Sequence, residues 1–326
     1  MAETLQTGLT RISHLVRAVE VAHDTPVRQS PNGVRFATFG ETGVADLDLD
    51  RMLEAVPTAI TAALKANTYY FVPLALREAT ETLDTGAPPR TETPEPAMVA
   101  SAYTDEFSDS AICHRNVELG HGKRGIFIST RLMGDRFALS FEFFINVAHA
   151  FVDQAGVSEA FSELVWKQAL DNVRGETSID AWELRNLAFG RAANAQPEFL
   201  KPTSRRNRSA FTSFSTRQRA FSNSSASNPP DSRSTIAQLN ASAQSAEEAQ
   251  SSIDEKERNA YLEAAFSDAV AIYLLSLALD FDYSELRERE YSLLAPTALA
   301  ARLRLVADLF PPNPTYEFAV RYRRRA

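Results

Sequence analysis

Three residues that could bind a metal or act in nucleophilic catalysis lie close together in the sequence, namely Cys113, His114 and His121. Zinc accepts a thiolate and imidazoles as ligands, and a thiolate is also a good nucleophile. A structural zinc site, however, takes four ligands at familiar spacings, and a cysteine nucleophile needs a base that this spacing does not place. The spacing therefore favours neither chemistry. The adjacent GHGKRG stretch at 120–125 lacks the long spacing of a phosphate-binding loop and predicts a surface turn.

A second candidate site lies in the apolar stretch FEFFINVAHAFVDQAG, where the spacing predicts a helix over 137–153. This stretch resembles the active-site helix of fungal, zincin-like metallopeptidases, in which an HExxH motif directs two histidines one turn apart at one metal. Aligning His149 with the second histidine puts Ile145 in place of the first and Asn146 in place of the catalytic Glu. Because asparagine cannot act as a general base, the resemblance implies a chain that has lost this motif.

The resemblance extends to residues 175–183, GETSIDAWE, which are similar to the stretch that supplies an acidic third ligand in such proteins. It implies His149, Glu176 and Glu183 as vestigial metal-binding candidates, with either acid in the third position. One histidine and one glutamate fall short of the three protein ligands that catalytic zinc normally takes. We therefore expect no catalytic residues and no cofactor, zinc being the only candidate. In the alternative interpretation, His149 is a hydrogen-bonded core residue and both acids lie near a helix start.

Basic and aromatic residues alternate in the segment after residue 200, and arginines recur at the C-terminus. Flexible segments use arginine for phosphates and phenylalanine for base stacking when they hold single-stranded nucleic acid. The candidate nucleic-acid-binding residues are Arg205, Arg206, Arg208, Phe211, Arg217, Arg219, Arg323, Arg324 and Arg325. The net charge of -8 favours the alternative, a solubilising linker and a charged tail.

The elements that must position these residues are mainly helical. Apolar residues at helical spacing predict helices over the following stretches: 50–66, 73–83, 137–153, 157–173, 254–279 and 296–310. Pro57 lies inside the first stretch, so that helix either kinks or begins there. The helix at 254–279 is apolar nearly all round after its charged start, so other helices must enclose it. β-Branched and aromatic residues predict a strand over 125–133. The sequence thus predicts an α+β fold, mainly helical, with a zincin-like core and a small sheet.

The composition divides the chain into three parts. Residues 197–252 are rich in Ser, Arg and Asn and poor in aliphatic residues, so they cannot bury enough apolar surface to offset their ordering entropy. We expect a disordered insert there. Residues 1–196 would form the N-terminal part of the core, and residues 253–326 would complete it and end in a basic tail.

Composition also bounds the class of protein. A single cysteine excludes an internal disulfide framework and fits a reducing compartment, so a cytoplasmic protein is expected. No apolar stretch reaches the ~20 residues of a membrane-spanning helix. We expect a non-catalytic structural or binding module with a protein partner, for example an accessory component of a larger assembly such as a virus particle. The alternatives are a metal-dependent hydrolase with a reduced site and a nucleic-acid-associated protein that acts through its basic arms.

Overall fold

The computed structural model describes six stretches of the chain, and the elements and contacts below belong to them: 15–77, 97–108, 111–131, 136–191, 254–286 and 292–321. The predicted insert at 197–252 lies outside these stretches. So do all the candidate nucleic-acid-binding residues, which are Arg205, Arg206, Arg208, Phe211, Arg217, Arg219, Arg323, Arg324 and Arg325.

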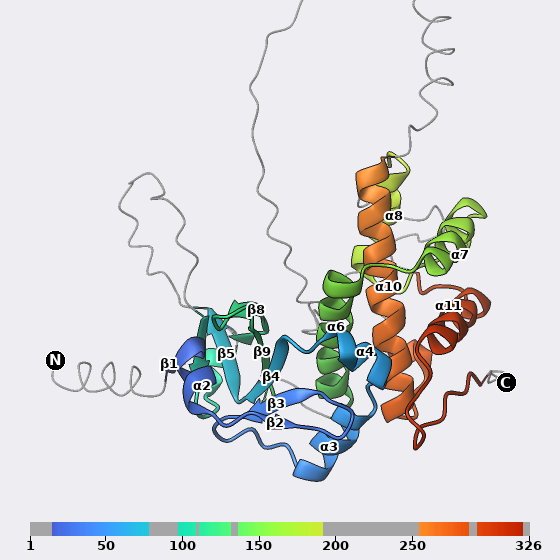
Figure 1. Cartoon of the computed structure of the whole chain (residues 1–326). Coiled ribbons are helices and arrows are strands. Elements are labelled where there is room, and N and C mark those ends of the chain that lie inside the picture. Colours follow the sequence, from blue (N-terminus) through green and yellow to red (C-terminus); the bar gives the residue numbers. More distant parts are fainter. Residues whose placement is uncertain are drawn as a thin grey trace, which may run out of the picture.

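Two small sheets lie at one end of the molecule (Figure 1). Their strands are β1 Leu15–Arg17, β2 Arg28–Gln29, β3 Arg35–Thr38, β4 Asn67–Val72, β5 Leu74–Arg77, β6 Ala97–Ala100, β7 Ala111–Ile112, β8 His114–Glu118 and β9 Arg124–Ser129. The five-stranded sheet has the order β2-β3-β4-β9-β8, and the four-stranded sheet has the order β1-β6-β5-β7. In the first sheet β3, β4 and β9 are parallel and both edge strands are antiparallel. The second sheet is antiparallel throughout.

The chain passes directly from one sheet to the other at Pro73, between β4 and β5. All six residues of β4 are buried, and Tyr69 of this strand pairs with Ile126 of β9. A proline has no N–H to donate to a continuing strand ladder. The change of sheet at this position is therefore consistent with the residue that occupies it.

The remaining elements are helices, most of which lie at the other end of the molecule (Figure 1). Their bounds are α2 Ala18–Asp24, α3 Asp46–Glu54, α4 Thr58–Ala63, α5 Asp105–Ser108, α6 Arg136–Ala155, α7 Glu159–Leu170, α8 Ile179–Ala188, α10 Glu255–Ala278 and α11 Pro296–Leu309, with a short 3-10 turn at Tyr283–Leu286. Side chains cap three of them. Ser158, Ser178 and Asp254 accept hydrogen bonds from backbone N–H groups in the first turns of α7, α8 and α10.

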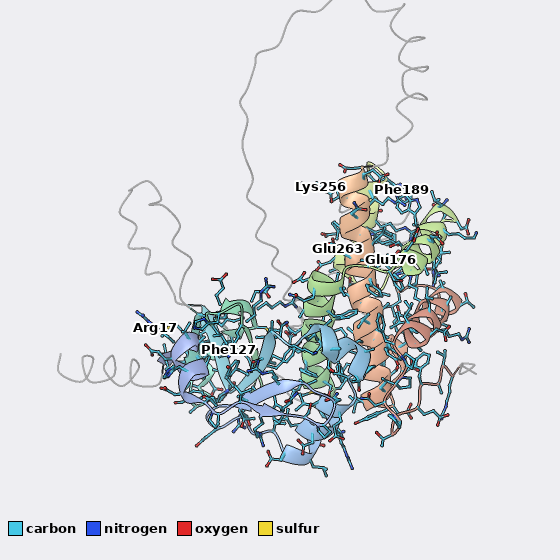
Figure 2. The ribbon with its side chains drawn as sticks, in the orientation of Figure 1. Arg17, Phe127, Glu176, Phe189, Lys256 and Glu263 are labelled. Atoms are coloured by element: carbon cyan, nitrogen blue, oxygen red, sulfur yellow. The ribbon has the colours of Figure 1, made fainter. Side chains whose placement is uncertain are left out.

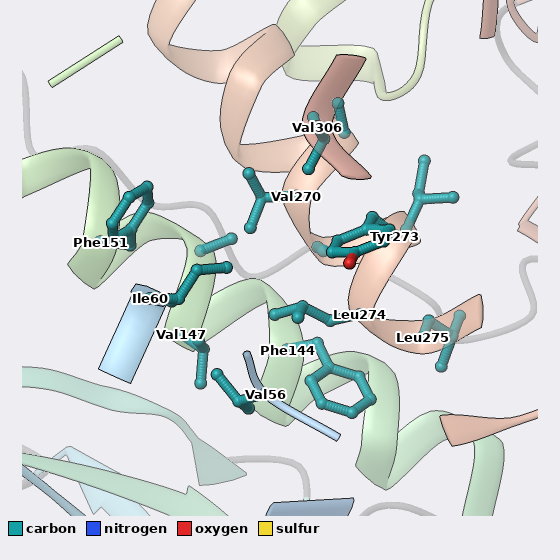
Figure 3. Close-up of a cluster of buried hydrophobic side chains, with 14 of the residues drawn as sticks. Val56, Ile60, Phe144, Val147, Phe151, Val270, Tyr273, Leu274, Leu275 and Val306 are labelled. Carbon is teal, nitrogen blue, oxygen red and sulfur yellow. The ribbon is translucent and has the colours of Figure 1, made fainter. Parts of the chain in front are cut away.

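One hydrophobic core joins parts of the chain that are far apart in sequence. The long helix α10 packs against α6, α8 and α11. Figure 3 shows Val270 and Leu274 of α10 near Phe144 and Val147 of α6, and Val306 of α11 lies in the same cluster. Each such side chain contributes roughly 1.5 to 3 kcal/mol when it is fully buried. The stretches on either side of residues 192–253 therefore stabilise each other.

Among the described helices, α10 is the one whose length and composition would let it cross a membrane, and 72% of its apolar window is buried in this fold. Its charged start, with Glu255 and Glu257 in the first turn, precedes this apolar part.

The predicted α+β class is confirmed, and so are the strand that became β9 and the helices that became α6, α7, α10 and α11. Of the two possibilities at Pro57, a helix begins there, because the 50–66 stretch contains the end of α3 and then the whole of α4. Pro57 is the N-cap residue of α4, where its missing N–H costs no helical hydrogen bond. The helix predicted over 73–83 is wrong over residues 74–77, which form β5 and pair with β6 on one side and β7 on the other. Residues 78–83 lie outside the described stretches.

Candidate functional site

The residues aligned with the metallopeptidase motif lie in the middle of α6. Ile145 and His149 are one turn apart and both are half-buried, and Ile145 packs against the main core. Asn146 is only 1% exposed and points elsewhere on the helix, toward the five-stranded sheet. The two polar residues of the aligned motif therefore lie in different surroundings.

Asn146 forms a polar bridge between α6 and the strand region that contains Cys113 and Arg115. Its Oδ1 accepts a hydrogen bond of 2.7 Å from Nε of Arg115 and one of 3.3 Å from Sγ of Cys113. Its Nδ2 donates to the backbone oxygen and to Oε1 of Glu142, at 2.7 and 2.8 Å. Because both lone pairs and both N–H groups are used, the amide is held in one orientation. Its role in this structure is to connect two elements.

Cys113 and the two nearby histidines face different surroundings. Burial raises the pKa of the Cys113 thiol well above its ordinary value, and the Glu142 carboxylate raises it further. Nε2 of His114 lies 2.7 Å from the backbone oxygen of Leu76 in β5. His121 is exposed in the turn after β8, with a φ of 51°. A thiol that stays protonated is a poor nucleophile and a poor ligand, and these three residues form no joint site.

Glu176, labelled in Figure 2, is completely buried, and its hydrogen-bond donors come from three helices. Its Oε2 lies 3.0 Å from Nη1 of Arg302 in α11, and its Oε1 lies 3.2 Å from Nη1 of Arg185 in α8. The Tyr261 hydroxyl in α10 donates to Oε1 at 2.6 Å. Burial and the nearby Glu176 carboxylate raise the pKa of Tyr261, so this hydroxyl remains a donor. Both carboxylate oxygens thus already have charged or polar partners.

The two arginines make further hydrogen bonds that fix the helices around them. Nε of Arg302 donates to Oε1 of Gln168 in α7 at 2.7 Å. Arg185 donates to the backbone oxygens of Val173 and Gly175, at 2.9 and 3.2 Å. The N–H groups of a buried guanidinium need hydrogen-bond acceptors, because burying an unpaired charge costs several kcal/mol. The network therefore connects α7, α8, α10 and α11.

Glu183 lies on α8 and is half-buried, and burial and the nearby Asp180 raise the pKa of its carboxyl group. In the part of the chain that the structure describes, no three His, Cys, Asp or Glu side chains come close enough to hold a metal. His149, Glu176 and Glu183 all lie in that part, so the structure does not bring these three predicted ligands together.

Arg185, Arg302 and Asp268, which surround Glu176, are not among the site residues predicted from the sequence. Asp268 is buried, accepts a hydrogen bond of 2.7 Å from the Thr177 hydroxyl, and has a pKa raised to about 7, chiefly by burial. The sequence signal that could have identified them is a charged residue within an apolar helical stretch. Asp268 interrupts the apolar run of α10, and Arg302 lies between apolar residues of α11.

Comparisons with family models, with curated proteins and with solved structures find no match to this chain.

Proposed function

We propose that the chain is a non-catalytic structural or binding module with a zincin-like, metallopeptidase-like core. In this proposal it acts through a protein partner in the cytoplasm, as an accessory component of a larger assembly such as a virus particle. The observation that carries the proposal is the burial and ion pairing of Glu176. Its carboxylate is 0% exposed and bound by Arg302, Arg185 and Tyr261, so a metal would have to displace two guanidinium groups.

The surroundings of Asn146 support the same proposal. A hydrolase that uses a metal-bound water needs a carboxylate or another base at the position that Asn146 aligns with. Here the amide is fully hydrogen-bonded to Arg115, Cys113 and Glu142. With these hydrogen bonds, Asn146 stabilises the packing of α6 against the strands. A hydrolase with a reduced metal site would have to work without a base at this position, and we keep it as the alternative.

The first test is metal analysis of the purified full chain after incubation with zinc. We expect no stoichiometric zinc and no peptide hydrolysis. One zinc per chain that is lost in H149A, together with hydrolysis that a chelator abolishes, would establish the hydrolase instead and overturn the proposal.

The second test measures what Glu176 does. E176Q removes the negative charge between two buried arginines, and loss of one partner from a buried ion pair typically costs about 3 to 5 kcal/mol. We expect E176Q to lower the free energy of unfolding by about that amount in urea titrations. The matched control is E183Q, on a half-buried side chain in the next helix, which should cost less than about 1 kcal/mol. Equal stabilities of E176Q and E183Q would contradict a structural role for Glu176.

A further inference from the structure

An open groove runs along the surface between α7 and α11. Residues from both helices line it, and its apolar part is made of Ala160, Leu164, Ala301 and Leu305. The two helices run in opposite directions, since Gln168 near the end of α7 donates to the backbone oxygen of Ala298 near the start of α11 at 3.2 Å.

On each helix, two oppositely charged residues flank the apolar part of the groove. Glu163 and Lys167 lie one turn apart on α7, and Arg304 and Asp308 lie one turn apart on α11. All four side chains belong to exposed residues. Each helix thus presents one positive and one negative charge beside a leucine. Lys167 also bonds to Asp171 of its own helix at 2.8 Å, but exposed pairs of this kind contribute little and exchange readily.

We propose that a second copy of this chain occupies the groove, related to the first by a two-fold axis that crosses both helices. Such an axis pairs α7 with α7 and α11 with α11, each in the reverse direction. If the axis crosses α7 midway between Glu163 and Lys167, Glu163 faces Lys167 of the second copy. A two-fold axis forms every contact twice, so the dimer has two Glu163–Lys167 pairs beside Leu164 of each copy.

Each helix that lines the groove also has an exposed leucine at its C-terminal end. Leu170 is 53% exposed at the end of α7, and Leu309 is 36% exposed one residue after Asp308. Because the helices are antiparallel, these leucines lie toward opposite ends of the groove. A second copy in the reverse direction would cover both ends, whereas a short ligand in the groove would leave them in water.

The size of the surface predicts a weak dimer. A standard stable interface uses about 20 to 30 residues a side, and the groove with its two flanking leucines supplies far fewer. Two chains that each carry a charge of -8 also repel each other. We therefore expect association at micromolar or higher concentrations. This self-association goes beyond the proposed function and does not depend on whether the chain is catalytic.

Sedimentation velocity of the full chain over a concentration series is the primary experiment. The parent chain should show a reversible equilibrium between monomer and dimer. E163K places positive charges opposite positive charges across the two-fold axis, and K167E does the same with negative charges. Each contact occurs twice and like charges face each other, so each variant should weaken dimerisation by at least about tenfold.

A mixture of the two variants gives the sharper result. E163K has two positive side chains on α7 and K167E has two negative ones, so the mixture should form a heterodimer with an affinity near that of the parent. The controls are E20K and K65E, which change the net charge equally at exposed positions outside the groove and should dimerise like the parent. General repulsion between the chains would affect the controls as much as the groove variants.

Three outcomes would overturn the proposal. The first is a parent chain that stays monomeric up to about millimolar concentration, which would assign the groove to a different protein or to none. The second is a dimer that E163K and K167E leave intact, which would place the interface elsewhere. The third is a mixture that associates no better than either variant alone. None of these outcomes bears on zinc binding or on the stability of E176Q, so they leave the proposed function untouched.

Discussion

Two carboxylates buried in the helical part of the molecule differ in the partners that the fold gives them. Glu176 lies between Arg185 and Arg302, which compensate its charge. Asp268 has hydrogen bonds with the Thr177 and Ser178 side chains, and the nearby Asp180 and Glu176 disfavour its ionisation. Burial is the largest contribution to its raised pKa of about 7. Near neutral pH, Asp268 therefore changes its charge inside the folded protein.

The raised pKa of Asp268 makes the stability of the fold depend on pH. Its pKa is about 7 in the folded protein against an ordinary value of 3.8, so between these values only the folded state holds the proton. The free energy of unfolding then decreases as pH rises from about 4 to about 7, and this decrease ends above pH 7. D268N cannot titrate and should lack this part of the decrease.

Urea titrations at pH 4 and pH 8 would measure the effect. We expect D268N and the parent to be similar at pH 4, where Asp268 is neutral in the folded state, and D268N to be more stable by roughly 1 to 4 kcal/mol at pH 8. D153N, at an exposed position on α6, should follow the parent at both pH values. A difference between D268N and the parent that is the same at pH 4 and pH 8 would show that Asp268 does not titrate in this range.

The sequence could not predict which residues form ion pairs or hydrogen bonds with Glu176. The resemblance at 175–183 implied Glu176 or Glu183 as a vestigial metal ligand, and in the structure Glu176 is a fully buried charge. Its partner Arg302 lies 126 residues away in the sequence, and Tyr261 lies 85 residues away. No local spacing relates residues at such separations. The sequence could therefore indicate an unusual acid, while its ion pairs became visible only in the fold.

At the scale of elements, long and strongly periodic stretches were predictable and short strands were not. The apolar run of α10 and the β-branched run of β9 appear where the sequence placed them. Strand β5 has only four residues, Leu74–Arg77, and its sequence LALR suits a helix as well as a strand. Pairing with β6 and β7 determines its conformation. Tertiary contacts decide such short segments because their local preferences are weak.

A tight contact between two loops holds the Glu176 network in place, and it depends on Gly175. This glycine has a φ of 81°, and a Cβ atom there would lie 2.0 Å from the backbone oxygen of Leu293. The neighbouring backbone pairs with the same segment, since the N–H of Glu176 donates to the oxygen of Ser292 and the N–H of Leu294 donates to the oxygen of Glu176. Any side chain at residue 175 would push these backbones apart.

G175A should therefore destabilise the fold much more than a positive φ alone would. Adopting such a φ costs an alanine about 1 to 2 kcal/mol, and the clash with backbone adds to that cost. The matched variant is G190A, because Gly190 has a φ of 65° and no atoms within 4 Å of the position of a Cβ. Thermal unfolding should show a clearly lower Tm for G175A than for G190A. Similar Tm values would mean that the 292–294 segment gives way easily and does not hold the network.

At the scale of the whole molecule, the stretches before and after residues 192–253 form one body. The N–H of Asp254 donates to the backbone oxygen of Ala188 at 3.3 Å, which brings the two ends of that segment together. Beside them the rings of Trp166 and Phe189 stack at 5.2 Å, and the Arg258 guanidinium lies 4.7 Å from the Trp166 ring. Phe189 is labelled at this end of α10 in Figure 2. These contacts hold the end of α8 and the start of α10 close together.

Limited trypsin digestion should cut the chain first between residues 205 and 252, because cleavage concentrates in polar segments whose composition predicts disorder. The two fragments should then elute together from a sizing column in native buffer and separate in urea. The reason is α10, whose side chains are buried against α6 and α8 along most of its length, so that separation would expose Val270, Leu274 and their neighbours to water. Mass spectrometry of the co-eluting peak identifies both pieces, and the undigested chain provides the reference elution volume. Fragments that separate in native buffer would mean that the C-terminal helices do not depend on the N-terminal part for their burial, which contradicts a single shared core.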